Sequence, residues 1–245
     1  MCGVMGMILN PEQDKSIEEL DGLRDRFSSL LRATEIRGKD ASGAFVVNKT
    51  GVSVHKSQGS ATKLTRTPMW GGLMNKIGNE TLGAIGHTRF ATKGCPTCSA
   101  NNHPIVINRQ ILGVHNGMLI NDEELKEIFP YEQEVDSAAI FSAMYGLTGS
   151  DPLTSEVVGD TLGLIEGDMA IGVVDVRDTS RIFIARDNGR PLYLLEDKDA
   201  LWIASTPEIL SVGLRTMARL KSESLDAFSV MEFNGSRNNK EVTKW

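Results

Sequence analysis

The sequence is poor in several features that would assign a protein to a class at once. Only three of its 245 residues are cysteine, a low and odd count that argues against a disulfide framework and favours a reducing compartment. No apolar run approaches the roughly 18 residues of a membrane-spanning helix, and the N-terminus lacks the pattern of a signal peptide. No proline-rich linker or repeat divides the chain. We therefore expect a soluble cytoplasmic protein with one domain over residues 1–245 and a polar tail from about residue 234.

Charge and glycine patterns exclude further functions. The 26 lysines and arginines are outnumbered by 32 acidic residues, and they form no basic stripe that would favour nucleic acid. The glycine-rich loops that hold nucleotide phosphates, GxxxxGK[ST] and GxGxxG after a strand, are both missing. We predict no nucleic-acid partner, no membrane partner and no cofactor. The oligomeric state stays open.

Hydrophobic spacing predicts strands, then helices, then strands. A capping-box pattern at Ser16–Glu19 precedes apolar residues at helical spacing, which predicts a helix over 17–35. Further helices are expected at 68–76, 122–129, 136–147, 155–165 and 205–214. Short apolar runs predict strands at 4–9, 44–48, 52–56, 82–88, 105–107, 111–114, 169–176, 181–186, 192–195, 201–204 and 227–233. Without regular strand–helix alternation, this order favours a layered α+β fold.

The first residues of the chain carry a possible nucleophile. If the initiator Met1 is removed, Cys2 becomes the N-terminus and holds a thiol and a free α-amine on one residue. A free thiol has a pKa near ~8.5 and an α-amine one of about 7.7–8.0, so the amine can act as a base for the thiol at neutral pH. Taken alone, Cys2 could equally be a small apolar residue that starts a buried strand.

Three further positions have both a structural and a functional interpretation. Arg89 follows a predicted strand, where its guanidinium can form a structural ion pair or bind a ligand carboxylate bidentately. Asn116-Gly117 is a common hairpin-turn pair, but it can also supply the two N–H donors of an oxyanion hole. Asp136 begins a predicted helix, so it can cap that helix or hold an ammonium group.

A CxxC pair occupies a loop in the middle of the chain. Cys95 and Cys98 have this spacing, and His103 follows five residues later. A zinc site needs four protein ligands, or three and a water, and only Cys2 could add a thiolate. We therefore predict no metal site, and interpret the pair as incidental loop cysteines or as a redox or regulatory thiol pair.

Taken in order, these motifs carry a family resemblance. The sequence resembles the glutaminase domain of class II (N-terminal-nucleophile) glutamine amidotransferases, and is similar above all to that domain of glucosamine-6-phosphate synthase. The resemblance covers residues 2 to about 233 and rests on segments 2–6, 37–43, 86–92, 102–104, 114–117, 167–170, 185–187, 191–192 and 204–207, together with Asp136. It implies the N-terminal nucleophile hydrolase fold, a four-layer αββα sandwich of two antiparallel sheets.

The resemblance also implies catalytic roles. Cys2 would attack the side-chain carboxamide of glutamine while its α-amine moves the proton. Asn116 and Gly117 would stabilise the tetrahedral oxyanion. The products of this attack are a γ-glutamyl thioester and ammonia, and water then releases glutamate.

Further roles follow for substrate binding. Arg89 would bind the glutamine α-carboxylate with help from Thr92, and Asp136 would bind the α-ammonium group. The residues that would support this site are Arg37, His87 and His103. The zwitterionic end of an amino acid needs one cation and one anion, which agrees with the reading of Arg89 and Asp136 from their chemistry alone.

Two departures fall in the loop that closes over glutamine in the family. Phe90 stands where the synthase-type loop has tryptophan, and Lys93 stands where it has a second histidine. Cys95 and Cys98 also lie in this loop, so their oxidation could alter its motion.

The sequence therefore predicts a stand-alone glutaminase domain that hydrolyses L-glutamine to glutamate and ammonia and passes the ammonia to a separate synthase. Two alternatives remain. The chain could be a partner-independent N-terminal-nucleophile hydrolase of another γ-glutamyl or acyl amide, or a non-catalytic binding module on the same fold.

Overall fold

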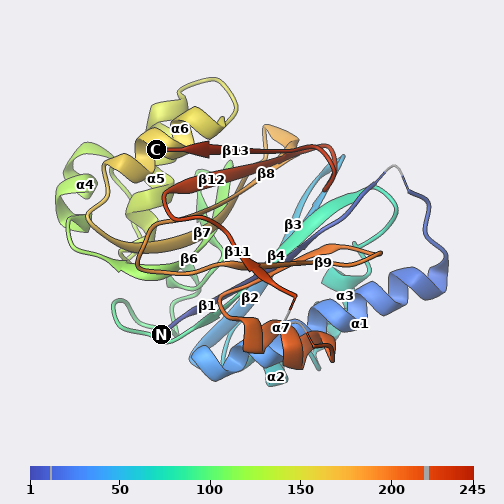
Figure 1. Cartoon of the computed structure of the whole chain (residues 1–245). Helices are drawn as coiled ribbons and strands as arrows, with labels where there is room; N and C mark the ends of the chain where they lie inside the picture. Colours follow the sequence, from blue (N-terminus) through green and yellow to red (C-terminus); the bar gives the residue numbers. More distant parts are fainter. Residues whose placement is uncertain (12, 218–220) are drawn as a thin grey trace.

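Two β-sheets between two helical layers make up the part of the chain that the structure describes. The structure is a computed structural model, and the residues that it describes are 1–11, 13–217 and 221–245. The sheets lie face to face, and helices cover the outer face of each (Figure 1). Every recorded strand pair is antiparallel. This is the predicted four-layer αββα sandwich of α+β class.

The first sheet is built around the N-terminal strand. Its strands, in spatial order, are β11 (Glu223–Ser224), β9 (Tyr193–Glu196), β10 (Leu201–Ala204), β1 (Gly3–Ile8), β4 (Thr81–Arg89), β2 (Ala41–Asn48) and β3 (Gly51–Gln58). The strand that follows Cys2 therefore has a neighbour on both sides. That double pairing fixes the main chain next to the candidate nucleophile.

The second sheet carries the other half of the molecule. Its strands, in spatial order, are β13 (Lys240–Lys244), β12 (Ser229–Asn234), β8 (Asp178–Arg186), β7 (Gly167–Asp175), β6 (Ile111–Leu119) and β5 (Ile105–Ile107). The loop between β4 and β5 joins the two sheets and contains the 3-10 turn η2 (Ser99–Asn101).

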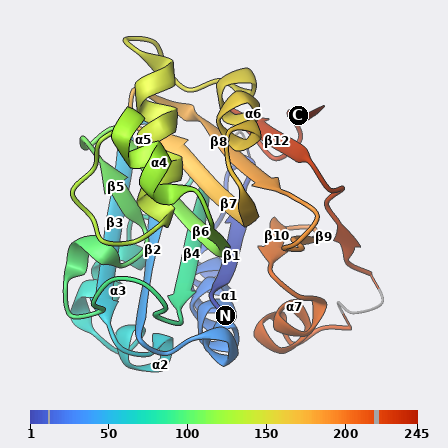
Figure 2. The ribbon, with the colours of Figure 1, turned by 90° about the vertical axis from the view of Figure 1, so that its left-hand side faces the viewer.

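The helices divide between the two outer faces (Figure 2). The first sheet is covered by α1 (Ile17–Thr34), α2 (Ala61–Leu64), α3 (Pro68–Met74) and α7 (Pro207–Leu214), with the 3-10 turn η1 (Glu35–Arg37) after α1. The second sheet is covered by α4 (Asp122–Ile128), α5 (Ser137–Thr148) and α6 (Ser155–Gly163). No helix in the described part of the chain is long and apolar enough to cross a bilayer.

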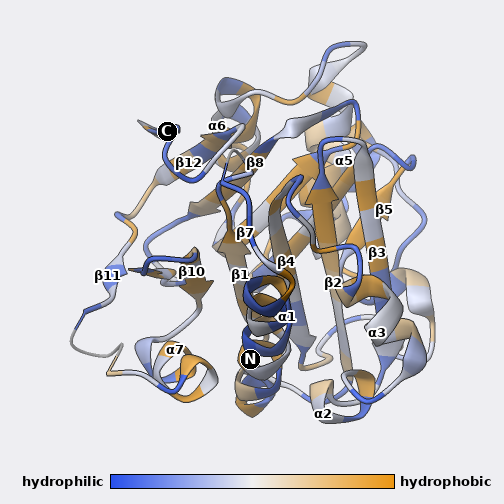
Figure 3. Cartoon of the chain, turned by 90° about the vertical axis from the view of Figure 1, so that its right-hand side faces the viewer, coloured by the Kyte–Doolittle hydropathy of each residue, from blue (hydrophilic) through white to orange (hydrophobic). Residues whose placement is uncertain are grey.

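Alternation along β1 shows how the layers share side chains. Val4 and Ile8 belong to the cluster between the two sheets, together with Ile85 of β4. Met5 and Met7 belong to the cluster under α1. Because successive strand residues face opposite sides, one strand contributes to both cores. The central strands are accordingly coloured mostly as hydrophobic in Figure 3.

The capping box predicted at the start of α1 is present. Ser16 Oγ accepts a hydrogen bond from the N–H of Glu19 at 3.3 Å, and Glu19 Oε2 accepts one from the N–H of Ser16 at 2.8 Å. Leu23, Phe27 and Leu31 are buried on one side of the helix against the first sheet, as the helical spacing predicted.

Strand β6 is longer than its apolar run predicted. The pattern ended the strand at Val114 and allowed a hairpin turn at Asn116-Gly117, but β6 continues to Leu119 and both residues pair with β7. A Cβ atom on Gly117 would lie 1.8 Å from the carbonyl oxygen of Asp168. The turn interpretation is therefore wrong, because both residues lie inside a paired strand. The glycine instead permits β6 and β7 to approach each other closely.

The polar tail is more ordered than its composition suggested. We expected a loosely held segment from Asn234, but Lys240–Lys244 forms β13 and pairs with β12 at the edge of the second sheet. Exposed charged side chains are typical of edge strands, since the backbone supplies the pairing and the charges discourage further strands from adding. The strand expected at 44–48 also begins earlier, at Ala41, and the short helix α2 was not predicted.

Two glycine substitutions should change stability in opposite directions. A Cβ at Gly113 in β6 would lie 2.0 Å from the buried ring of Phe141 in α5, so Gly113→Ala should lower the free energy of unfolding by about 1–3 kcal/mol. Gly22 in α1 has no such neighbour within 4 Å, so Gly22→Ala should raise it by up to about 1 kcal/mol. Urea unfolding of the two variants measures both, and equal effects would contradict this packing of α5 on β6.

Candidate active site

Cys2 lies where the chain enters β1, and its surroundings fix the main chain there. Arg37 Nε donates a hydrogen bond to the carbonyl oxygen of Cys2 at 2.6 Å. The thiol of Cys2 donates to the carbonyl oxygen of Phe90, 3.6 Å away. Gly3 allows the segment to pack on the end of α1, since a Cβ there would lie 2.4 Å from Thr34 Cγ2. The thiol is therefore held beside the start of the 90–102 loop.

Burial and nearby charges together set the pKa of the Cys2 thiol. Burial raises the pKa of the Cys2 thiol, and this effect outweighs the lowering by the Phe90 contact, the N-terminal amine and the Arg89 guanidinium. The carboxylate of Asp136 raises that pKa further. The charges of Arg89 and Asp136 therefore both act on Cys2, although these residues follow it by 87 and 134 positions in the sequence. The thiol needs a base to become a nucleophile at neutral pH.

The pair predicted to stabilise an oxyanion lies on β6, in the other sheet. The side chain of Asn116 is buried, and its Nδ2 has no hydrogen-bond partner among the residues that the structure describes. A buried N–H group without an acceptor is costly, so a ligand oxygen at this amide would relieve that cost. His115, next to it, is held by a contact of 2.8 Å between its Nδ1 and Ser137 Oγ.

Arg89 ends β4 with its guanidinium turned to the 90–102 loop. Its Nη1 donates to Asn102 Oδ1 at 2.7 Å, and its Nη2 donates to the carbonyl oxygens of Lys93 at 2.5 Å and Gly94 at 2.8 Å. Within the described residues these recorded partners are neutral oxygens, so a structural ion pair is not formed there. An arginine has five N–H groups, so these three contacts do not use all of its donors.

Asp136 performs the capping role and keeps capacity for a ligand. It is the N-cap of α5, where its Oδ1 accepts from the N–H of Ser137 at 2.9 Å. Its Oδ2 accepts from the N–H of Leu119 at 2.9 Å, which ties the carboxylate to the strand that carries Asn116. Ser137 Oγ also donates to Oδ1, at 3.5 Å, so Oδ2 is the oxygen whose second lone pair remains for an ammonium group.

The 90–102 loop is tied to α4 by a lysine. Lys93 Nζ donates to carboxylate oxygens of Asp122 and Glu123, the latter at 2.9 Å. These two hydrogen bonds raise the pKa of Lys93, so its ammonium stays charged. Thr92 is exposed on the same loop, and no hydrogen bond from its side chain to another described residue is recorded. The recorded contacts therefore anchor this loop through Lys93, and the role predicted for Thr92 stays a prediction.

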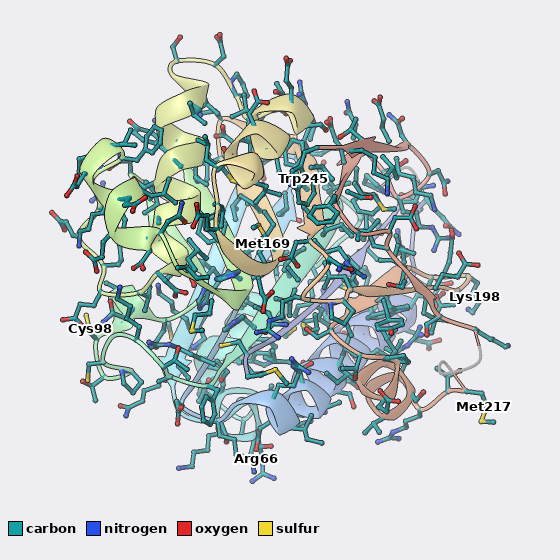
Figure 4. All side chains as sticks on the ribbon, turned by 60° about the vertical axis from the view of Figure 1, so that its left-hand side comes forward. Arg66, Cys98, Met169, Lys198, Met217 and Trp245 are labelled. Carbon is teal, nitrogen blue, oxygen red and sulfur yellow. The ribbon has the colours of Figure 1, made fainter. Side chains whose placement is uncertain are left out.

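The cysteine pair lies on the exposed side of this loop (Figure 4 labels Cys98). The N–H of Cys98 donates to the carbonyl oxygen of Cys95 at 3.2 Å, which makes the segment a tight turn. Cys95 Sγ lies 3.0 Å from Thr97 Oγ1. Across residues 1–11, 13–217 and 221–245, no group of three or more histidine, cysteine or acidic residues is placed to hold a metal ion.

The rings of the two predicted supporting histidines, His87 and His103, pack against each other at an interplanar angle of 33°. The rings of His87 and His103 have centroids 4.0 Å apart, and His87 Nε2 donates to the carbonyl oxygen of His115 at 2.9 Å. Burial lowers the pKa of His87 to about 3 and also lowers the pKa values of His103 and His115. All three rings are therefore neutral at neutral pH and act as packing surfaces.

Asn102 is a site residue to which the sequence assigned no role. It is 1% exposed, accepts from Arg89 through Oδ1 and donates through Nδ2 to the carbonyl oxygen of Pro96 at 2.7 Å. The signal was present in the Asn102-His103-Pro104 motif of the resemblance. Its partners could not be read from the sequence, because they depend on how the loop folds back.

A cavity of about 700 Å³ lies beside the N-terminus. Its lining includes Met1, Ile36, Arg37 and, from α7, Ile209 and Val212. It borders the Cys2 segment from the side of α1 and α7, apart from the residues that surround the thiol.

Comparisons with known proteins identify the family of this chain. A family model described as a glutamine amidotransferase domain matches residues 87–212, just over half of the chain. The glutamine–fructose-6-phosphate aminotransferase (isomerizing) of Geobacillus kaustophilus (strain HTA426) is 31% identical over 205 residues, which cover 80% of this chain and 31% of that protein. The protein of the same name from Bacillus thuringiensis subsp. konkukian (strain 97-27) is 32% identical over 200 residues, which cover 78% of this chain and 30% of that protein. The chain thus spans about a third of the length of these relatives.

A solved structure shares the fold. Glutamine phosphoribosylpyrophosphate amidotransferase from B. subtilis, complexed with ADP and GMP, matches with a TM-score of 0.70 at 20% identity, over 99% of this chain and 49% of that one. The expected N-terminal-nucleophile fold is therefore confirmed.

Acid should destabilise the fold through its buried imidazoles. Because the pKa of each is lower in the folded chain than the usual ~6.5, the unfolded state binds protons first, and the free energy of unfolding falls as the pH drops below about 6.5. Between the pKa of an imidazole in the folded chain and its pKa in the unfolded chain, each imidazole lowers the free energy of unfolding by up to roughly 1.4 kcal/mol for each pH unit of acidification. Urea unfolding at pH 7 and pH 5 measures this loss.

The variant His87→Asn isolates one of these groups. It removes a titrating ring, so its stability should fall less steeply with acid than that of the unsubstituted protein, while the carboxylates common to both cancel in the comparison. Identical slopes would contradict the assignment of His87 as a neutral buried group.

Proposed function

Because the chain belongs to the family of glutamine amidotransferase domains, we propose that it hydrolyses L-glutamine to glutamate and ammonia with Cys2 as the nucleophile. The observation that supports this proposal is that the Cys2 thiol contacts the carbonyl oxygen of Phe90, next to Arg89, and that the Arg89 cation and the Asp136 anion both act on it electrostatically. A free amino acid presents one carboxylate and one ammonium group, so its recognition needs this pair of charges.

The nucleophile requires removal of Met1. Met1 is 63% exposed, so an aminopeptidase can reach it. The α-amine of Cys2 then takes the thiol proton, the thiolate forms a bond to the amide carbon, and the C–N bond breaks as the proton passes to the leaving nitrogen. The products are a γ-glutamyl thioester and ammonia. Water next attacks the thioester carbon, releases glutamate and restores the thiol.

The tetrahedral intermediate needs donors for its oxyanion. Asn116 Nδ2 is a buried N–H group without a described partner, and Gly117 lies beside it on β6. We assign both to the oxyanion, since fixed donors in a water-poor site cost no reorganisation during the reaction.

The rest of the pocket holds the substrate and the nucleophile in place. The Arg89 donors that its loop contacts leave would bind the α-carboxylate, and Oδ2 of Asp136 would bind the α-ammonium group. Thr92 assists at the carboxylate from the loop. The supporting residues are Arg37, which holds the carbonyl group of Cys2, and His87 and His103, whose rings pack against each other.

We further propose that the ammonia is passed to a separate synthase. The relatives whose names specify an aminotransferase are about three times as long as the matched part of this chain. Ammonia is mostly protonated at neutral pH, and only the neutral molecule is a nucleophile, which favours direct transfer to a docked partner.

A glutamine analogue that alkylates the nucleophile should test the proposal directly. With 6-diazo-5-oxo-L-norleucine, the intact mass should show loss of Met1 and gain of one adduct. The adduct should be missing from Cys2→Ala and present in Cys98→Ala, a matched change at an exposed cysteine. Retained Met1 with no adduct would overturn the glutaminase proposal, and faster turnover of other γ-glutamyl amides than of glutamine would replace its substrate.

Removal of the side-chain oxyanion donor should slow the chemical step. For Asn116→Ala we expect kcat for glutamine hydrolysis to fall roughly 10²–10³-fold with little change in KM, because the interaction forms in the transition state. Asn238→Ala, at an exposed asparagine far along the chain, is the control and should leave both parameters unchanged. A rise in KM alone would place Asn116 in substrate binding instead.

A further inference from the structure

Lys56 on β3 makes contacts that its sequence position gives no reason to expect. Its Nζ donates to the carbonyl oxygens of Asn102 at 2.7 Å and Pro104 at 2.8 Å, on either side of His103. Burial lowers the pKa of its ammonium to about 8. No ion pair between Lys56 and a described carboxylate is recorded. Its recorded side-chain partners are the two main-chain carbonyl oxygens of this one segment.

Strands β2 and β3 of the first sheet contact the segment 102–104 directly. Gly43 of β2 pairs with Lys56 of β3. A Cβ on Gly43 would lie 2.5 Å from the carbonyl oxygen of His103, so the segment 102–104 rests directly on the β2–β3 pair. The missing side chain at Gly43 and the long side chain of Lys56 together fix the height and the orientation of this segment.

Through Asn102 this segment reaches the candidate carboxylate-binding residue. Lys56 holds the carbonyl oxygen of Asn102, and the side chain of Asn102 accepts from Arg89 Nη1. The other recorded contacts of the Arg89 guanidinium are carbonyl oxygens of Lys93 and Gly94, in the more exposed part of the loop. Asn102, at 1% exposure, is thus the buried member of the three.

We propose that Lys56 is a positioning residue, which sets the orientation of the Arg89 guanidinium through Asn102 and thereby the affinity of the site for the α-carboxylate of its substrate. This inference rests on the proposed function for the identity of that substrate. It assigns Lys56 no contact with the substrate itself.

The kinetic consequence is specific to binding. The α-carboxylate is remote from the amide that reacts, so an interaction with it stabilises the bound substrate and the transition state alike. Lys56→Met should therefore raise KM for glutamine roughly tenfold, a coupling typical of residues in one hydrogen-bond network, while kcat stays within about twofold. Lys56→Arg, which keeps a cation and N–H donors, should recover part of the loss.

Two comparisons separate this role from a general loss of structure. Lys49→Met makes the same change at an exposed lysine in the turn of the same hairpin and should leave KM unchanged. In an Asn102→Ala background, where the link to Arg89 is already broken, Lys56→Met should add little. Effects on KM that multiply in the double variant would overturn the proposal.

A spectroscopic readout tests the link without catalysis. In protein with ¹⁵N-labelled arginine, the Nε–H signal of Arg89, assigned by its loss in Arg89→Lys, should shift or broaden in Lys56→Met and not in Lys49→Met. If that signal and KM are both unchanged, Lys56 does not position Arg89. If the signal responds while the unsubstituted protein shows neither turnover nor an adduct with the glutamine analogue, the positioning role stands and the proposed function fails.

Discussion

The register between β1 and β4 is the constraint on which the site depends. Gly3 pairs with Thr88, so the residue before Gly3 and the residue after Thr88 arrive level at the same end of the sheet. That register sets Cys2 beside Arg89 by main-chain hydrogen bonds alone, before any side chain is considered. A slip by one residue would turn every side chain of β1 to the wrong face and separate the two, which the buried Val4 and Ile8 resist.

The second sheet supplies what the first lacks. β6 carries Asn116 and, three residues on, Leu119, whose N–H holds the Asp136 carboxylate. Asn116 and the carboxylate of Asp136, the proposed oxyanion donor and ammonium ligand, are therefore both fixed to β6, while Cys2 and Arg89 belong to the other sheet. Because the core between the sheets is closely packed by large apolar side chains, the distance across the site is set by that packing rather than by the loops.

Two polar groups at the candidate site lack the partners that would stabilise them best. Asn116 leaves an amide N–H without a described acceptor, and Arg89 turns its charge to neutral oxygens. Such arrangements lower stability and persist at binding sites, where the ligand supplies the missing partner. The 90–102 loop is held by charged groups from three elements: Arg89 of β4, the partners of Lys93 in α4, and Lys56 of β3.

Local signals in the sequence determined the elements and the chemistry, and tertiary structure decided how they meet. The capping box of α1 and the short apolar runs are encoded by neighbouring residues and predicted a layered α+β fold. The αββα arrangement and the roles of Cys2, Arg89 and Asp136 were implied by the resemblance that the ordered motifs carry. The in-strand place of Asn116 and the contacts of Asn102 and Lys56 could not be predicted. Each depends on a partner far along the chain, and strand pairing and close backbone approach leave no local pattern, because they are settled only when the two sheets pack together.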